Sequence, residues 1–388
     1  MIDNENQEKQ SQTENNSDAY SVGALYGASS APQETAAPAE EPAPVEEPVE
    51  EAAPAEETAE TAETAEAEET APAVTSSSTE AAPAEEADAP AETGGERKGP
   101  QISGFLPALK GFISFFTIIR LPVGEREVED MESKFYVAPL AGLFIGLAAF
   151  IFCMILSLCR FDMLVQSVLA IGFVYLFSKF LHFDGLTDFG DGMVCSSANR
   201  EDHIRALKDS RVGAGGIGVA LVVVLASTIL LNEVSSVLEI GFRLGTAHFW
   251  TIGVAFVILA VEVLVKNAQV AAAAFGQPGT GMAARQVECT DRFSLIVSTV
   301  ITLVILAIIG VIYYVLADGS WGGMPFRTYW LAILIAIGVL MSIATGYVMA
   351  HYANRTFGFV NGDILGATNE VSRAAILLVA FMALGAFL

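Results

Sequence analysis

Seven long apolar stretches with few charges constrain this chain more than any other feature. The hydrocarbon core of a bilayer is about 30 Å thick and is crossed by roughly 20 residues of α-helix. Inside lipid, backbone polar groups must be bonded within the protein, which favours helices. We therefore predict an all-α, polytopic integral membrane protein. Its predicted transmembrane helices are 135–159, 163–181, 214–232, 247–265, 294–317, 329–350 and 371–388.

The segment 104–120, GFLPALKGFISFFTIIR, is apolar but interrupted. Pro107 and Lys110 lie in its first half, and only eight uncharged residues, 112–119, separate Gly111 from Arg120. We predict an interfacial or re-entrant helix here, with a complete transmembrane span as the alternative.

The N-terminal part differs sharply in composition from the rest. The whole chain has a formal charge of −25, and residues 1–100 hold 25 acidic residues against three basic ones. This part is rich in Pro, Ala and Glu and poor in large apolar residues, so it cannot bury enough surface to offset the entropy of ordering. We predict a disordered acidic tail at 1–100, acting as a spacer or as a docking segment, and a membrane-embedded catalytic domain at 101–388.

The distribution of Lys and Arg predicts the orientation. The loops 120–134, 182–213, 266–293 and 351–373 hold twelve of these residues, whereas the opposite loops hold three. Cytoplasmic loops carry such an excess. The first set is therefore predicted to face the cytoplasm, and its unusual polar residues suggest a site assembled at that surface of the cell membrane.

Three aspartates gather in the sequence FLHFDGLTDFGDG. Asp184, Asp188 and Asp191 have the spacing i, i+4 and i+7, which places them on one face of a helix. Carboxylates so close repel one another unless a cation lies between them. Oxygen ligands favour Mg²⁺, Mn²⁺ or Ca²⁺, and Mg²⁺ is usually held by one or two carboxylates together with substrate phosphates. The four cysteines show no CxxC pair or zinc-type spacing.

A basic stripe follows the aspartates. Arg205, Lys208 and Arg211 recur every three residues, and Asp209 adds a fourth carboxylate. Such cations can hold phosphate oxygens while a carboxylate-bound metal bridges them, although positive charges also simply mark cytoplasmic loops. The G-x-G-x-x-G pattern at 213–218 has no preceding strand, so we interpret it as close helix packing or as phosphate approach to a helix start.

Three other features complete the candidate site. In GFVNGDILGATNEVSR, Asp363 and Glu370 share a helical face, with Asn361 and Asn369 nearby. His182 can transfer protons near neutral pH, but such a histidine is more often a satisfied interface residue. A glycine-rich loop after Lys266 could fold over a ligand, although most such loops are connectors.

These motifs, in this order, resemble a known family. LHFDGLTDFGDG, LKDSRVGAGG and GDILGATNE, together with the earlier GFISFFTIIRLPV, look like the adenosylcobinamide-GDP ribazoletransferases, also called cobalamin 5'-phosphate synthases. The resemblance covers about 104–388. It implies a Mg²⁺-dependent membrane enzyme of cobalamin biosynthesis that joins α-ribazole, or its 5'-phosphate, to adenosylcobinamide-GDP and releases GMP.

The resemblance also implies roles for residues. Asp184, Asp188 and Asp191 would bind the metal and the pyrophosphate. Our own hypothesis for the chemistry is that Asp191 or Asp209 accepts the proton of the attacking hydroxyl. The resemblance marks Lys208, Asp209, Ser210 and Arg211 as a second conserved block, and Asp363 and Glu370 as part of a third. Together with these, we expect the following candidates from the residues themselves to bind substrate: His182, Arg205, Lys266, Asn361 and Asn369. Many members have Ser-Arg where this chain has Lys266 and Asn267, which leaves the role of that pair open.

Two alternatives remain from the sequence. The pattern D-x-x-D-G at 188–192 is similar to part of the signature of CDP-alcohol phosphotransferases, which would make the substrate a lipid precursor. A cation transporter is the other alternative, but it predicts polar residues at mid-membrane and inverted repeats, and we find neither.

Overall fold

The structure is a computed structural model, and it describes residues 104–243, 252–316 and 326–385. The predicted acidic tail at 1–100 lies outside these residues. Within them the chain is helical, without any β-strand; one isolated bridge joins Pro278 to Val360.

Twelve α-helices and one 3₁₀ turn occur in the described part of the chain. Their bounds are α1 Phe105–Phe116, α2 Glu125–Ser133, η1 Phe135–Val137, α3 Ala138–Leu158, α4 Met163–Phe177, α5 Leu181–Val194, α6 Arg200–Leu207, α7 Ala214–Arg243, α8 Gly253–Phe275, α9 Met282–Cys289, α10 Arg292–Leu316, α11 Phe326–Thr356 and α12 Gly362–Gly385. Among the described residues, six helices are long and apolar enough to cross a membrane, or seven if the bent pair α4 and α5 is one span. The predicted all-α polytopic fold is confirmed.

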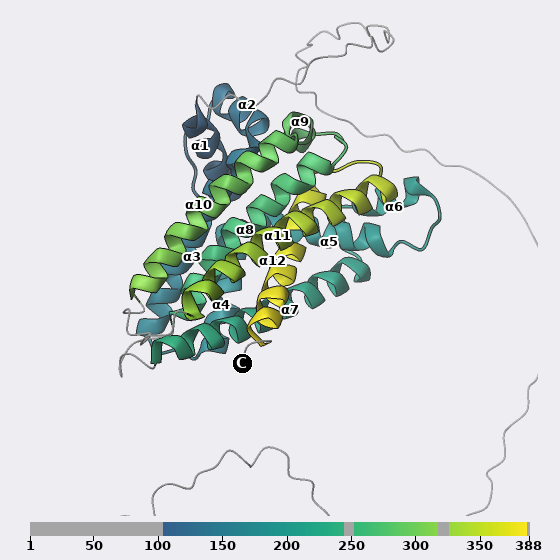
Figure 1. The fold of residues 1–388 in the computed structure, drawn as a ribbon. Coiled ribbons are helices and arrows are strands. Elements are labelled where there is room, and N and C mark those ends of the chain that lie inside the picture. Colours follow the sequence, from purple (N-terminus) through teal and green to yellow (C-terminus); the bar gives the residue numbers. More distant parts are fainter. Residues whose placement is uncertain (1–103, 244–251, 317–325, 386–388) are drawn as a thin grey trace, which may run out of the picture. The chain divides into compact units, whose positions relative to one another are not determined.

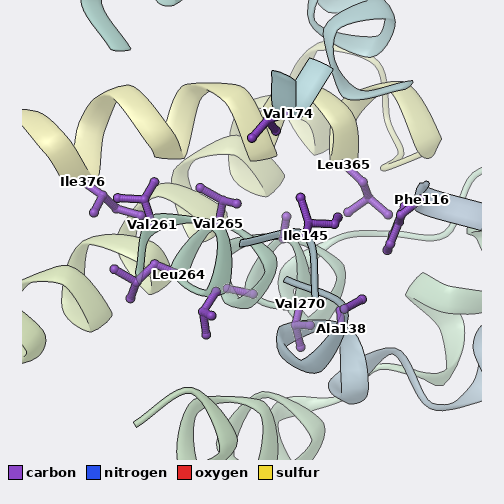
Figure 2. Close-up of a cluster of buried hydrophobic side chains, with 14 of the residues drawn as sticks. Phe116, Ala138, Ile145, Val174, Val261, Leu264, Val265, Val270, Leu365 and Ile376 are labelled. Carbon is purple, nitrogen blue, oxygen red and sulfur yellow. The ribbon is translucent and has the colours of Figure 1, made fainter. Parts of the chain in front are cut away.

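Helix α8 is the centre of the bundle. It contacts α3, α10, α11 and α12, and 20 of its 23 residues are buried. Figure 2 shows apolar side chains of α8, such as Val261 and Val265, among Ile145 of α3 and Leu365 and Ile376 of α12. Helix α10 instead leaves most of its apolar side chains exposed, and α7 exposes a row of them that includes Leu221, Leu225 and Ile229. Such outer faces are suited to lipid.

A sharp bend separates α4 from α5. The two helices meet at 94°, and the break contains Lys179 and Phe180 with φ of 57° and 56°. Left-handed backbone at two non-glycine residues stops the α4 helix. The span predicted at 163–181 therefore ends at Phe177, and α5 turns aside to lie against α7 and α12.

Two predicted helix boundaries are wrong, because both helices are longer than the sequence suggested. Helix α8 continues ten residues past 265 to Phe275, and α12 begins at Gly362 rather than at 371. Lys266 and the GDILGATNE motif therefore lie in helices and not in loops. A prediction from mean hydropathy makes such helices too short, because it treats their polar residues as solvent-exposed. Here those polar residues have partners inside the protein.

The helices carry few charges, but Lys266 and Arg373, which the sequence placed in loops, lie inside the bundle. Arg373 of α12 is fully buried and lies between Glu262 of α8, at 2.8 Å, and Glu370. Lys266 is fully buried one turn beyond Glu262. Two acids and two bases thus balance inside the bundle, as buried charges require.

The N-terminal helix α1 is short. Its 12 residues extend for about 18 Å at 1.5 Å per residue, which is less than the bilayer core, so the alternative of a complete span finds no support. It packs on α2 and α3, and Lys110 donates to Glu127 at 2.9 Å. Figure 1 shows α1, α2 and α9 grouped at one end of the long helices.

Candidate active site

Two glycines bring the first aspartates beside the third motif. A Cβ placed on Gly185 of α5 would lie 2.7 Å from the backbone oxygen of Asp363, and one on Gly366 of α12 would lie 3.3 Å from the backbone of His182. This close contact of α5 with α12 places Asp188 where Asp363, Asp184 and Asp191 all repel its negative charge. Residues about 180 positions apart in the sequence thus form one acidic cluster.

Asp191 has a second task. Its two carboxylate oxygens accept hydrogen bonds from the backbone N–H groups of Gly213, at 2.6 Å, and Gly216, at 2.8 Å. Both donors lie at the start of α7, where N–H groups lack helical partners and favour a negative charge. Gly190 lies close to Gly216. The glycine pattern therefore serves helix packing, as one of our two interpretations expected.

Asp363 lies in the first turn of α12. Asn361 accepts from the backbone N–H of Ile364 at 3.2 Å and donates to the Asp363 carboxylate at 2.7 Å. Lys208, after α6, is near enough for its charge to stabilise that carboxylate. Its Nζ also lies 5.6 Å from the ring centre of Phe359.

A cavity of about 230 Å³ opens beside the cluster. Asp184 and Asp363 line it together with His182 and Asn361. The remaining lining residues are Phe115, Phe116, Phe135, Leu181, Gln269, Thr280, Ala283, Gln286, Gly362, Leu365 and Gly366. The first and third sequence motifs therefore share one cavity, with walls supplied by α1, α8 and α9.

Other predicted binding residues are buried in the bundle. Lys266 donates to Nε2 of His182 and to Oδ1 of Asn369, both at 2.8 Å. Lys266, Asn369 and Glu370 are each buried and do not line the cavity. Because the ammonium group only donates, Nε2 of His182 must accept, so this nitrogen is occupied. The arrangement positions α5 against α8 and α12, and substrate contact by these residues stays a prediction.

The basic stripe is mostly on the surface. Arg205 pairs with Asp202 at 3.3 Å and Arg211 with Asp209 at 3.0 Å, with the two arginine side chains 78% and 88% exposed. The hydrogen bond from Arg211 lowers the pKa of the Asp209 carboxyl, which weakens it as a proton acceptor. Ser210 is exposed beside this pair. Of the three stripe cations, Lys208 is the one that faces the cluster.

The sequence reasoning missed the walls of the cavity. Phe115 and Phe116 lay in a segment that we interpreted for its membrane position and its family resemblance but not for ligand contact, and Gln269 and Gln286 drew no attention. A polar residue within an apolar helix is a recognised signal of function. Gln269, in the run KNAQVAAAAF, met that description.

The three aspartates were predicted to bind a metal. Among the described residues, no group of three or more His, Cys, Asp or Glu side chains is arranged to hold a metal ion. A site of one or two carboxylates, completed by water and substrate phosphates, would not require such a group. The metal therefore stays a prediction.

Taken together, fold and cavity define a helical membrane protein with an acidic, cavity-forming site at the ends of its spans. The profile of the cobalamin-5-phosphate synthase family matches residues 108–381, and the chain belongs to that family. The family resemblance predicted from the motifs is confirmed, and the chain is placed among transferases.

Curated relatives agree. The chain is 28% identical to the adenosylcobinamide-GDP ribazoletransferase of Methanococcoides burtonii over 74% of this chain and 95% of the relative. Enzymes of the same name from Methanosarcina mazei, 28% identical over 72% and 92%, and Chlorobaculum parvum, 29% identical over 72% and 95%, are also similar. No solved structure matches the chain.

Proposed function

We propose that this protein joins α-ribazole, or its 5'-phosphate, to adenosylcobinamide-GDP with release of GMP, by Mg²⁺-assisted phosphoryl transfer. The observation that carries the proposal is the shared cavity, in which Asp184 from the first motif and Asp363 from the third lie together. Family membership and the names of the relatives supply the substrates. A lipid precursor as substrate has no such support.

The acidic cluster suits a hard cation. Asp188 is repelled by three neighbouring carboxylates, and a cation would relieve that repulsion. Asp184 and Asp188 would hold Mg²⁺, with Asp363 close to them. Asp191 stays a candidate ligand because each carboxylate oxygen has a further lone pair beyond its amide hydrogen bond. When bound, Mg²⁺ neutralises the pyrophosphate and stabilises the charge of the transferring phosphoryl group.

Charged side chains of the protein would complete the environment of the phosphates. Lys208 lies close to Asp363 and would neutralise a phosphate bound at the cluster. Arg205 and Arg211 are exposed ion-pair members and would have to leave their partners to help. Asp209 would likewise have to leave Arg211 before accepting a proton from the hydroxyl that attacks the phosphorus next to the cobinamide.

The proposed site faces the cytoplasm. The segment 182–213 and the helix α9 contain five of the twelve Lys and Arg residues used for the orientation, and the connection from α11 to α12 follows Arg355. Contacts within the structure join these parts: Arg285 of α9 pairs with Glu129 of α2, and Pro278 bridges to Val360. They belong to one end of the bundle, which the positive-inside rule assigns to the cytoplasm.

The test is direct. Purified protein in lipid nanodiscs is incubated with adenosylcobinamide-GDP, α-ribazole and Mg²⁺, and GMP and the corrinoid product are quantified. We expect stoichiometric GMP, loss of the reaction with EDTA and its recovery on adding Mg²⁺. We expect Asp188→Asn to abolish turnover while the protein keeps its helical circular dichroism. Activity of that variant at the wild-type level would refute the assignment of the cluster.

A further inference from the structure

Two buried glutamines line the cavity with unpaired polar atoms. Gln269 of α8 is 2% exposed; its Nε2 donates to the backbone oxygen of Leu365 at 2.9 Å, and its Oε1 has no hydrogen-bond partner among the described residues. Gln286 of α9 is 4% exposed, and its Nε2 likewise has no partner in the described part of the chain. Native proteins rarely leave buried polar atoms unsatisfied. One acceptor and one donor beside the same cavity therefore point to a ligand that supplies both partners.

The other walls are apolar and aromatic. Phe115, Phe116 and Phe135 line one part of the cavity with Leu181, and Leu365 lines it from α12. Such walls favour a flat, uncharged ring. No Lys or Arg is among the lining residues, so the cavity suits a neutral group and the phosphates belong outside it, on the side of Lys208.

The size of the cavity limits its occupant. A protein cavity of about 150 Å³ can hold benzene, and this one, at about 230 Å³, is large enough for a bicyclic ring with part of a sugar. It is far too small for a corrin macrocycle.

We propose that this cavity binds the α-ribazole nucleoside and that Gln269 and Gln286 determine its recognition. This inference rests on the proposed function. The dimethylbenzimidazole of α-ribazole has two methyl groups and one unsubstituted ring nitrogen that accepts a hydrogen bond, and it has no ring N–H because its other nitrogen carries the ribose. The Nε2 of Gln286 supplies a donor to that nitrogen, and the Oε1 of Gln269 accepts from a ribose hydroxyl.

The competing aromatic group in the reaction is the guanine of the second substrate. Its edge offers several donors and acceptors, and it would leave most of them unpaired against phenylalanine walls, which binding sites avoid. A nucleoside held in the cavity also brings its ribose near Asp184 and Asp363, the carboxylates of the cluster.

The experiment measures binding of α-ribazole and of GMP to the full-length protein in nanodiscs by equilibrium dialysis. The variants are Gln269→Met and Gln286→Met, which keep side-chain volume and remove the polar atoms. Gln166→Met is the matched control, because Gln166 is a fully buried glutamine of α4 that does not line the cavity. We expect each cavity variant to bind α-ribazole roughly tenfold more weakly than wild type. The affinity for GMP and the KM for adenosylcobinamide-GDP should stay unchanged in these variants, and the control should match wild type in every measurement.

A second measurement uses wild-type protein and so does not depend on how the variants fold. The riboside of benzimidazole without its two methyl groups should bind roughly tenfold more weakly, since each buried methyl contributes to affinity. Equal binding of the two nucleosides would overturn the inference, as would unchanged α-ribazole affinity in both folded variants or weakened GMP binding in them.

The two proposals fail in different ways. Wild-type protein that binds α-ribazole through the glutamines but forms no GMP with both substrates would refute the proposed function and leave the cavity assignment in place. Normal turnover combined with cavity variants that bind α-ribazole like wild type would refute the cavity assignment alone.

Discussion

Replacing Asp191 separates its structural task from metal binding. The carboxylate accepts two backbone N–H groups at the start of α7, at 2.6 and 2.8 Å. Hydrogen bonds to a charged group contribute about 1.5–3 kcal/mol each, and a helix N-cap about 0.5–2 kcal/mol. Asp191 is partly exposed, so water replaces part of both bonds in the variant. We therefore expect Asp191→Ala to lower the free energy of unfolding by about 2–4 kcal/mol.

Two further substitutions sharpen this prediction. Asp191→Asn keeps one acceptor oxygen and should lose about half as much stability. Asp184→Asn is the matched control, because its carboxylate accepts no hydrogen bond from the described residues of α7; it should change stability by less than about 0.5 kcal/mol. The assay is reversible unfolding in mixed SDS micelles, followed by helical circular dichroism without added metal.

The unfolding of Asp191→Ala with and without metal distinguishes the two roles of this residue. Loss of stability in Asp191→Ala without metal shows that Asp191 anchors α7 to α5 whatever else it binds. An unfolding free energy within about 0.5 kcal/mol of wild type would refute the cap, and a loss seen only when Mg²⁺ is present would assign the residue to the metal instead.

Other substitutions test the packing of the bundle, all by the same unfolding assay. Gly185→Ala should lower the free energy of unfolding by about 1–3 kcal/mol and reduce transferase activity, because the added methyl collides with α12. Gly218→Ala is the control, since its added methyl meets nothing within 4 Å among the described residues, and it should be neutral or slightly stabilising. Equal effects of the two substitutions would contradict the close contact. Glu262→Gln should cost about 3 kcal/mol or more, since it leaves the buried Arg373 without one of its two acidic partners; a neutral result would count against the buried ion network. Arg211→Ala should leave the unfolding curve unchanged because its ion pair is exposed to solvent, and a marked shift would mean that the pair is structural.

The sequence was sufficient for the fold class and for the helical face shared by three of the four aspartates of the acidic cluster. Apolar runs of about 20 residues leave the backbone few alternatives in lipid, so the spans could be placed without a structure. The spacing of Asp184, Asp188 and Asp191 already put them on one helical face, and that helix is α5. These are local properties, set by periodicity and by length.

Pairings between distant segments required the structure. The approach of α5 to α12 depends on Gly185 and Gly366, and no local pattern says which glycines will face each other. For the same reason Lys266 and Arg373, interpreted from sequence as loop cations, proved to be buried charges, because their acidic and polar partners come from other helices.

The cavity itself is the clearest case of tertiary organisation. Its walls come from α1, α5, α8, α9 and α12, and no local pattern says that the phenylalanines of α1 or the glutamines of α8 and α9 will face the acidic motifs. A glutamine in an apolar helix can be a packing residue or a ligand, and sequence does not distinguish them. Only the folded arrangement, which leaves one atom of Gln269 and one of Gln286 buried without a partner, makes that distinction, because hydrogen bonding depends on which groups meet in space.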